Sequence, residues 1–414
     1  MSERKKLSLA TKIFIGLGLG IIAGLIFMKT GKTEWAVEYV KPFGTIFLNL
    51  IKFIVVPIVL TSIISGVISM KDIRKVGSIG WKTIAYYMTT TAFAVTIGLL
   101  GSNVFKGMYQ VLSTSNLKYE AAEPTKITDT IVNIFPSNFI NPMANAAMLQ
   151  VIVIALLFGF GIILAGEKGK PFGGFIESAS EVCMKVMEMI INLSPIGVFC
   201  LIVPVVAENG PQILGSLALV IAAAYICYII HALVVYSASV KIMAGLSPVE
   251  FFKGVAPAMA MAFSSASSVG ALPLNIECTE KMGARRDIAS FVLPLGATIN
   301  MDGTAIYQGV TAIFIARCFG IDLTIAQMLT IVLTATLASI GTAGVPGSGM
   351  IMLAMVLQSV GLPVEGIALV AGVDRIFDMG RTTVNITGDA ACTMIVSRLE
   401  EKKEARLAAN RSRA

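Results

Sequence analysis

Charged residues are scarce in this 414-residue sequence: 14% are Asp, Glu, Lys or Arg, whereas 56% are hydrophobic. Soluble domains usually carry about 25% charged residues. A soluble chain would have no place for so much apolar surface, so most of this chain is expected to lie in lipid. The net charge of +7 does not indicate a nucleic-acid partner, because Lys and Arg gather in short loops and at both ends.

Histidine is nearly absent, and the cysteines form no motif. His231 is the single histidine and lies in an apolar run, and no CxxC pair occurs among the six cysteines. General acid–base catalysis most often uses histidine, and no nucleophile–base pair is visible, so an enzyme is not expected. The scattered cysteines indicate buried thiols rather than a zinc or disulfide framework. A channel remains a remote alternative, which saturable exchange would exclude.

Long apolar runs are the first feature that is present. About 20 apolar residues can cross a bilayer. The N-terminal run has no cleavage site behind it, so it is expected to be a retained helix. Positive charges in alternate loops predict that both termini are cytoplasmic, as in a multi-pass protein of the plasma membrane. The candidate spans lie near residues 12–29, 43–69, 82–106, 146–165, 172–206 and 213–243.

The pattern changes after residue 250. Residues 251–263 form an apolar arm too short to cross, and a serine-rich segment at 264–268 follows it. The segment 323–362 repeats this design around a glycine-rich tip at 340–349. Backbone and hydroxyl groups at such tips cannot face lipid. Two re-entrant helical hairpins are therefore expected.

One full span follows each hairpin. The first span covers roughly 288–316 and is interrupted at 300–304, and the second covers roughly 366–397. Hairpin and span repeated from opposite sides form an inverted repeat, and paired interrupted segments are the best sequence pointer to a transporter's binding site. The fold class predicted is an all-α integral membrane protein with eight transmembrane helices plus two re-entrant hairpins.

A polar stripe runs along the last span. At about 100° per residue its members fall on one arc of the helix. Charges within hydrocarbon cost at least about 2.5–3.5 kcal/mol each, so a working site is favoured over a purely structural network of ion pairs. The stripe consists of Asp374, Asp378, Arg381, Thr382, Asn385 and Asp389.

The charges of this region do not balance. Asp302 and the aspartates of the stripe carry four negative charges, against two positive charges from Arg375 and Arg381. Unpaired buried charge is prohibitive, so about two bound cations are predicted. Oxygen ligands suit hard cations, which indicates sodium. No histidine lies between residues 286 and 397, so groups that carry protons near neutral pH are scarce there.

The same stripe predicts an acidic substrate with an amine. Arg381 offers a planar fork for a carboxylate. Asp378 lies one turn earlier on the same face and suits an ammonium group. Asn385 and free amides at the hairpin tips suit a second carboxylate.

Ordered motifs along the chain carry a resemblance to a known family: LIKFIVVPIVL at 50–60, SSASSVGALP at 264–273, LPLGATINMDGTAIYQG at 293–309, ASIGTAGVPGSGMIML at 338–353 and DMGRTTVNITGD at 378–389. The chain resembles the dicarboxylate/amino acid:cation symporters, the glutamate transporter family, and the resemblance covers essentially the whole chain. It implies an elevator-type homotrimer that couples sodium entry to the uptake of L-aspartate or L-glutamate, with three sodium ions per substrate.

The resemblance also implies roles for individual residues. Asp378 would bind the substrate amine and Arg381 its side-chain carboxylate. The further substrate contacts implied are Thr382, Asn385 and Thr304, with the backbone of Ser268, Val345 and Gly349. The implied sodium sites are Asn385 and Asp389 with the carbonyls of Gly296 and Asn300; the carbonyls of Thr298, Ser339, Ile340 and Thr342; and Tyr87, Thr90, Thr91, Asn300 and Asp302.

The family pattern also implies a division of the chain. Residues 1–76 and the helices of 143–245, apart from the sixth, would form a static scaffold. The segment 77–142 would give a helix of the transport domain and a loop, residues 246–398 the transport core, and 399–414 a cytoplasmic tail.

The sequence departs from the family in a few places. Relatives carry an arginine where this chain has Ala266 or Met379, and Arg375 substitutes for it electrostatically or instead pairs with Asp374. Gln308 stands where proton-coupled members have Glu, which argues against proton countertransport. Carriers of C4-dicarboxylates or neutral amino acids on the same fold, possibly proton-coupled, remain alternatives.

Overall fold

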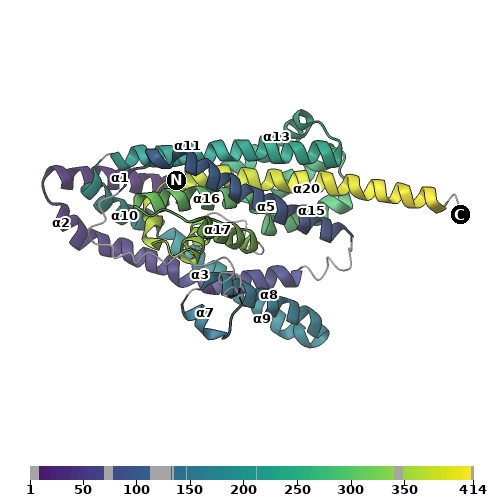
Figure 1. Ribbon diagram of the computed structural model, residues 1–414, viewed down its shortest axis with the longest axis horizontal. Helices are drawn as coiled ribbons and strands as arrows, with labels where there is room; N and C mark the ends of the chain where they lie inside the picture. The colour runs from purple at the N-terminus through teal and green to yellow at the C-terminus, as the bar shows by residue number, and fades with distance from the viewer. Residues whose placement is uncertain are drawn as a thin grey trace, which may run out of the picture.

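The computed structural model describes residues 9–69, 78–111, 132, 135–145, 147–210, 212–339 and 348–411. The described residues form helices and connecting turns, with no strand among them. The molecule is elongated, and the last helix runs along its length and projects beyond the other helices at one end (Figure 1). The expected all-helical fold is therefore confirmed.

The first part of the chain forms long apolar helices joined by short helical turns. The predicted run at 172–206 is divided, because the backbone turns at Leu193 and a new helix starts at Ser194 with Pro195 in its first turn. The elements are α1 (Leu9–Lys29), α2 (Thr33–Trp35), η1 (Ala36–Val40), α3 (Lys41–Ser69), α5 (Ser78–Phe105), η2 (Lys106–Met108), α7 (Ile140–Ala144), α8 (Met148–Ala165), η3 (Gly166–Gly169), α9 (Lys170–Asn192), α10 (Ser194–Asn209) and α11 (Gln212–His231).

A chain of short segments continues α11 to the first hairpin. The π-helical turns η4 (Ala232–Tyr236) and η5 (Val240–Ala244) flank α12 (Ser237–Ser239). A π-helical turn inserts an extra residue and frequently marks a functional site. Tyr236, the last residue of η4, is fully buried.

The serine-rich segment is the tip of a helical hairpin, as expected. α13 (Pro248–Ser265) and α14 (Ser268–Lys281) pack against each other. Ala266 ends α13 in the left-handed region with φ of 50°. The Ser267 hydroxyl then accepts the amide hydrogen of Gly270 and so caps α14. The serines thus satisfy backbone donors at the tip.

The span after this hairpin is broken where the sequence predicted an interruption. α15 (Arg286–Ile299) ends before Asn300, and α16 (Asp302–Cys318) starts after Met301. Asn300 adopts an extended backbone. This break leaves two helix ends and the side-chain amide of Asn300 inside the molecule. Asn300 and Met301 are both buried.

The second repeat has the same plan. α17 (Ile325–Ala338) and α18 (Ser348–Ser359) pack against each other as the expected hairpin arms, and the tip from 340 to 347 lies outside the described residues. η6 (Val364–Gly366) and α19 (Ile367–Ala371) follow, and α20 (Asp374–Arg411) carries the polar stripe. α20 continues through the charged segment after Arg398, so the predicted tail is helical to Arg411.

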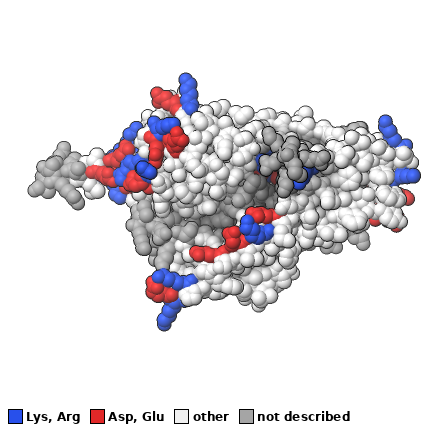
Figure 2. Space-filling view, turned by 180° about the vertical axis from the view of Figure 1, so that it is seen from behind, with Lys and Arg blue, Asp and Glu red and all other residues white. Residues whose placement is uncertain are grey.

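The surface has the character of a membrane protein. Most charged side chains in Figure 2 lie towards the two ends of the long axis, and much of the surface between them is uncharged. Within the described residues, four helical segments are long and apolar enough to cross a bilayer: Thr11–Lys29, Ser78–Met108, Gln150–Ile190 and Ile213–Ala244. The chain is a multi-pass membrane protein.

Candidate functional site: a buried ionic stripe beside two hairpins

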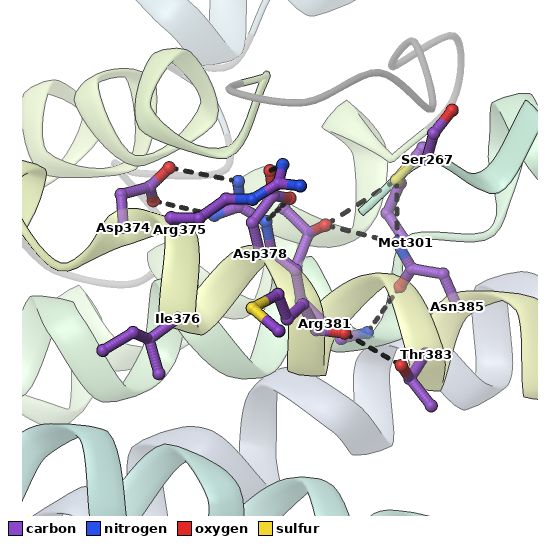
Figure 3. Close-up of polar contacts among 12 residues, drawn as sticks. Ser267, Met301, Asp374, Arg375, Ile376, Asp378, Arg381, Thr383 and Asn385 are labelled. Carbon is purple, nitrogen blue, oxygen red and sulfur yellow. Dashed lines mark hydrogen bonds and ion pairs between the residues drawn. The ribbon is translucent and has the colours of Figure 1, made fainter. Parts of the chain in front are cut away.

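The centre of the site is the guanidinium of Arg381, whose side chain is 2% exposed. Its Nε donates to Oδ1 of Asp378 at 2.8 Å, and its terminal nitrogens donate to both oxygens of Asp374 at 3.0 and 3.4 Å. The guanidinium carbon also lies 4.9 Å from the ring centre of Tyr307 on α16. Figure 3 shows these acidic groups beside Arg381 on α20. A buried cation of this kind is tolerated because its donors are satisfied.

Arg375 lies at the edge of this group and connects α20 to the first hairpin. Its Nη2 donates to the carbonyl of Ser265 at 3.1 Å and approaches that of Ser264 at 3.5 Å. Its Nη1 lies 3.9 Å from Oδ2 of Asp378. Carbonyls at a helix C-terminus attract a cation. Arg375 therefore caps α13, and within the described part of the chain its ion pair is with Asp378 rather than with Asp374.

The next turn of the stripe meets the break before α16. The Asn385 side-chain oxygen accepts the amide hydrogen of Gly303 at 2.7 Å, and its nitrogen lies 3.5 Å from the hydroxyl of Thr304. The same nitrogen contacts the Met301 sulfur, which Figure 3 shows beside Asn385. Thr382, which directly follows Arg381 in the sequence, is also buried. Asn385 thus holds the N-terminus of α16 against α20.

A second polar cluster surrounds Asp389. Asn300 donates its side-chain amide to Oδ1 of Asp389 at 2.9 Å and to the carbonyl of Asn385 at 2.8 Å. A side chain at Gly296 would collide with Asp389 and with the Tyr87 hydroxyl, so glycine there lets both approach α15. The side-chain oxygen of Asn300 is buried and has no hydrogen-bond partner among the described residues. An orphaned oxygen beside a carboxylate fits a cation.

Asp302 forms a third cluster with helices from the first half of the chain. Oδ1 accepts from the Thr91 hydroxyl at 2.7 Å, and Oδ2 accepts from the Tyr236 hydroxyl at 2.8 Å. Oδ2 also lies 3.2 Å from Nε2 of His231. All of these side chains are buried. The donors hold the carboxylate in one orientation but add no permanent positive charge.

The remaining residues expected at the sodium sites and the substrate site make few contacts with one another within the described part of the chain. Thr90 is buried and donates to the carbonyl of Tyr87 at 3.2 Å. Thr298 is exposed and Ser339 is buried, and no hydrogen bond between the two is recorded within the described chain. Ser268 is buried at the start of α14. Ile340, Thr342 and Val345 lie outside the described residues.

The charge deficit predicted from sequence has a definite location. Asp374 and Asp378 share Arg381, whereas in the part of the chain that the structure describes no lysine or arginine pairs with Asp302 or Asp389. Both of these carboxylates are at most 2% exposed. The uncompensated charge therefore lies at Asp389 and Asp302, beside the break between α15 and α16, and not at Arg381.

Comparison with known proteins decides the family. The model of the sodium:dicarboxylate symporter family matches residues 9–399 of this chain. The chain belongs to this family. Members of the sodium:dicarboxylate symporter family are transporters, so the enzyme class excluded from sequence is excluded here as well. The family resemblance carried by the sequence motifs is confirmed.

Individual relatives cover nearly the whole chain. It is 38% identical over 405 residues to the proton/sodium-glutamate symport protein of Geobacillus stearothermophilus, which spans 96% of this chain and 95% of that protein. It is 38% identical over 411 residues to the proton/glutamate-aspartate symporter of Escherichia coli K12, with 96% and 94% covered. It is also 32% identical over 403 residues to the C4-dicarboxylate transport protein of Bacillus subtilis 168, with 95% and 94% covered.

Within this symporter of the sodium:dicarboxylate family, sequence reasoning missed two residues. His231 and Tyr236 hold Asp302 from a helix far away in sequence. A lone histidine in an apolar run gives no local periodic signal, and neither residue belongs to the stripe. One signal was available: a polar residue inside an apolar span usually faces a partner within the bundle.

Proposed function

We propose that this protein is a secondary symporter that couples inward sodium movement to the uptake of L-aspartate or L-glutamate. The observation that carries the proposal is the buried Arg381 guanidinium with Asp378 on the same helix face, 2.8 Å away. One group suits a carboxylate and the other an ammonium. An acidic amino acid is the small solute that presents both.

On substrate binding, a carboxylate of the substrate would replace Asp374 as the partner of the terminal nitrogens of Arg381. The fork that holds Asp374 has the planar, two-nitrogen geometry that a substrate carboxylate requires. A substrate that takes this fork would leave its amine beside Asp378, while Thr382, Thr304 and Asn385 supply hydroxyl and amide groups. Ser268, Val345 and Gly349 at the hairpin tips would complete the site with backbone groups.

Sodium coupling is supported by the carboxylates that lack a cation. Asp389 with Asn300 and Asn385, and Asp302 with Thr91, present oxygens in two neighbouring clusters. Sodium ions at these clusters would neutralise both carboxylates and offset the cost of their burial. These clusters account for two ions, and a third would need the carbonyl site of Thr298, Ser339, Ile340 and Thr342.

The same proposal includes the architecture that the family resemblance implied. Residues 1–76 and most of 143–245 form a static scaffold in a homotrimer, whereas residues 246–398 form the transport core that moves as an elevator. Helix α5, in the segment 77–142, moves with the core because it supplies Thr91 to Asp302. Both termini face the cytoplasm, as the distribution of Lys and Arg supports.

Calorimetric titration of the purified protein tests the proposal. Aspartate should bind with heat in sodium buffer and not in choline buffer of equal ionic strength. Equal binding of aspartate in the two buffers would show that binding does not require sodium, and the proposed coupling would be wrong. If aspartate bound in neither buffer and succinate bound instead, the substrate would be a dicarboxylate and the proposed substrate would be wrong.

A second candidate is a C4-dicarboxylate carrier, which the similarity to the Bacillus subtilis transport protein favours. Asp378 argues against it, because a carboxylate beside the substrate repels a dianion that lacks an amine. Competition of labelled aspartate with succinate, serine and glutamate ranks the candidates. Proton coupling, as in the names of two glutamate relatives, is measured in the same experiment by varying the pH gradient.

A further inference from the structure

A basic cavity lies between α5 and the last turns of α20, away from the ionic stripe. Nζ of Lys82 and the hydroxyl of Ser78 each lie 2.6 Å from Oε1 of Glu400, and these contacts join the two helices. Beside them is a cavity of about 370 Å³. Its walls are Lys82, Leu399, Lys402, Lys403, Arg406 and Leu407.

The cavity carries an excess of positive charge. Lys82 lies 2.6 Å and Lys403 lies 3.8 Å from Glu400, so one carboxylate is shared by two ammonium groups. Burial raises the pKa of Glu400, but hydrogen bonds from Lys82 and Ser78 outweigh burial and hold that pKa below its usual value. Lys402 and Arg406 are exposed, and no ion pair is recorded for either within the described chain. Two cations are therefore available for an anionic ligand.

The neighbouring residues place the cavity at the level of lipid headgroups. Trp81 precedes Lys82 on α5 and is 71% exposed. Tryptophan is enriched where the apolar bilayer core meets the headgroups. On α20 the buried apolar run ends at Val396, and charged residues begin at Arg398. The two helices thus pass from apolar to charged character at the same end of the molecule.

We propose that this cavity binds the headgroup of an anionic phospholipid. Lys402 and Arg406 would hold the phosphate, because basic pockets between transmembrane helices recognise anionic headgroups. Leu399, Leu407 and the Trp81 ring would contact the glycerol and the first part of the acyl chains. A free phosphate ion would satisfy the cations but would leave this apolar wall without a partner.

Because of its position, a lipid bound in this cavity would connect α5 and α20 and so affect the stability of the protein. α5 carries Thr91, which donates to Asp302, and α20 carries Arg381. A headgroup held by α20 and by Lys82 of α5 links the ends of two helices that supply the ionic site. Bound lipid therefore stabilises the folded protein through these two helices, by an amount that rises with the logarithm of its affinity and concentration.

Lipid binding to the whole protein in neutral detergent tests this proposal. Native mass spectrometry would count bound phosphatidylglycerol, phosphatidylcholine and inorganic phosphate, each titrated separately. The double variant Lys402→Gln/Arg406→Gln should lose roughly 30-fold in affinity for phosphatidylglycerol, since each cation near an anionic headgroup contributes about a factor of five. The single variant Lys402→Gln, expected to lose about fivefold, keeps the test valid if the double variant misfolds.

The matched control is Lys241→Gln/Lys253→Gln, which removes two exposed lysines from a different part of the surface. This control should retain wild-type affinity for phosphatidylglycerol. Equal losses in the control and the test variants would mean that only general surface charge attracts the lipid, and the proposal would be wrong. Inorganic phosphate that competes as strongly as the lipid, or phosphatidylcholine that binds equally, would also overturn it. A failure to observe aspartate transport would not overturn the lipid proposal, because lipid binding is measured directly.

Discussion

Gly349 stands directly against the guanidinium of Arg381, so closely that a Cβ atom at this position would overlap its Nη1 atom. Gly349 is the second residue of α18, the second arm of the second hairpin, whereas Arg381 belongs to α20. The absence of a side chain is therefore what lets the second hairpin approach the cation. The relationship brings the second hairpin against the arginine of the proposed substrate site.

Gly349→Ala should weaken aspartate binding by about tenfold or more, because Arg381 is held by Asp374 and Asp378 and cannot yield freely. Gly161→Ala is the control, since nothing lies within 4 Å of that position. Calorimetric titration of both variants in sodium buffer gives the comparison. Wild-type affinity in Gly349→Ala would mean that the hairpin does not close on the arginine.

Arg381→Lys should lower kcat/KM for aspartate by about 10- to 100-fold, because a lysine cannot make the paired hydrogen bonds of the guanidinium. Arg381→Cys should abolish uptake of acidic substrates and admit neutral amino acids such as serine. Initial rates with labelled aspartate and serine distinguish these outcomes. Unchanged aspartate uptake in either variant would remove Arg381 from the substrate site.

Asp378→Asn should separate substrates that carry an amine from those that do not. Loss of the ammonium partner should raise the KM for aspartate by about 10- to 100-fold. Inhibition by succinate should stay the same or improve, since the carboxylate that repels a dianion is gone. An equal fall in the affinity for both compounds would contradict the assignment of Asp378 to the amine.

His231 is a positioning residue for Asp302, and its substitution should act on sodium. His231→Leu removes the Nε2 donor to Asp302, the proposed sodium ligand, and should lower the apparent sodium affinity by about tenfold, because loss of a partner of a metal ligand commonly costs that much. His231→Gln places an amide nitrogen near the same point and should recover most of that affinity. The readout is the sodium concentration that half-saturates aspartate binding.

A merely structural role for His231 predicts a different result. In that case the Leu and Gln variants would lower thermal stability together and leave the sodium dependence of binding unchanged. Tyr236→Phe provides an independent check, because it removes the other donor to Oδ2 of Asp302. It should shift the sodium requirement in the same direction as His231→Leu.

The stripe on α20 could be predicted from sequence because its residues follow one helical period. Asp374, Asp378, Arg381, Asn385 and Asp389 are all buried, as one face of a helix within a bundle requires. The first hairpin was also readable, since a serine-rich tip between short apolar arms has no other stable place in lipid. Local chemistry determined both features.

Contacts between distant helices could not be predicted in the same way. Asp302 meets His231 and Tyr236 only because α11, η4 and α16 pack together, and no spacing within the sequence encodes that contact. The ion pair between Arg381 and Asp374 was not predicted for another reason. The two residues lie seven positions apart on one face, so the spacing allowed the pair, but the length of the arginine side chain decided it.

The division of the predicted run at 172–206 has a local cause that the apolar average concealed. α9 ends at Asn192, and Ser194 with Pro195 begins α10. Proline in the first turn of a helix has no donor to lose. A serine–proline pair inside a long apolar run is therefore a helix start rather than a tolerated interruption.

Uptake of labelled aspartate into proteoliposomes under an imposed sodium gradient tests the central claim most directly. The protein should accumulate aspartate above equilibrium when sodium is high outside, and accumulation should collapse when the gradient is dissipated with the membrane left intact. Accumulation that is the same with sodium and with choline outside would contradict the account.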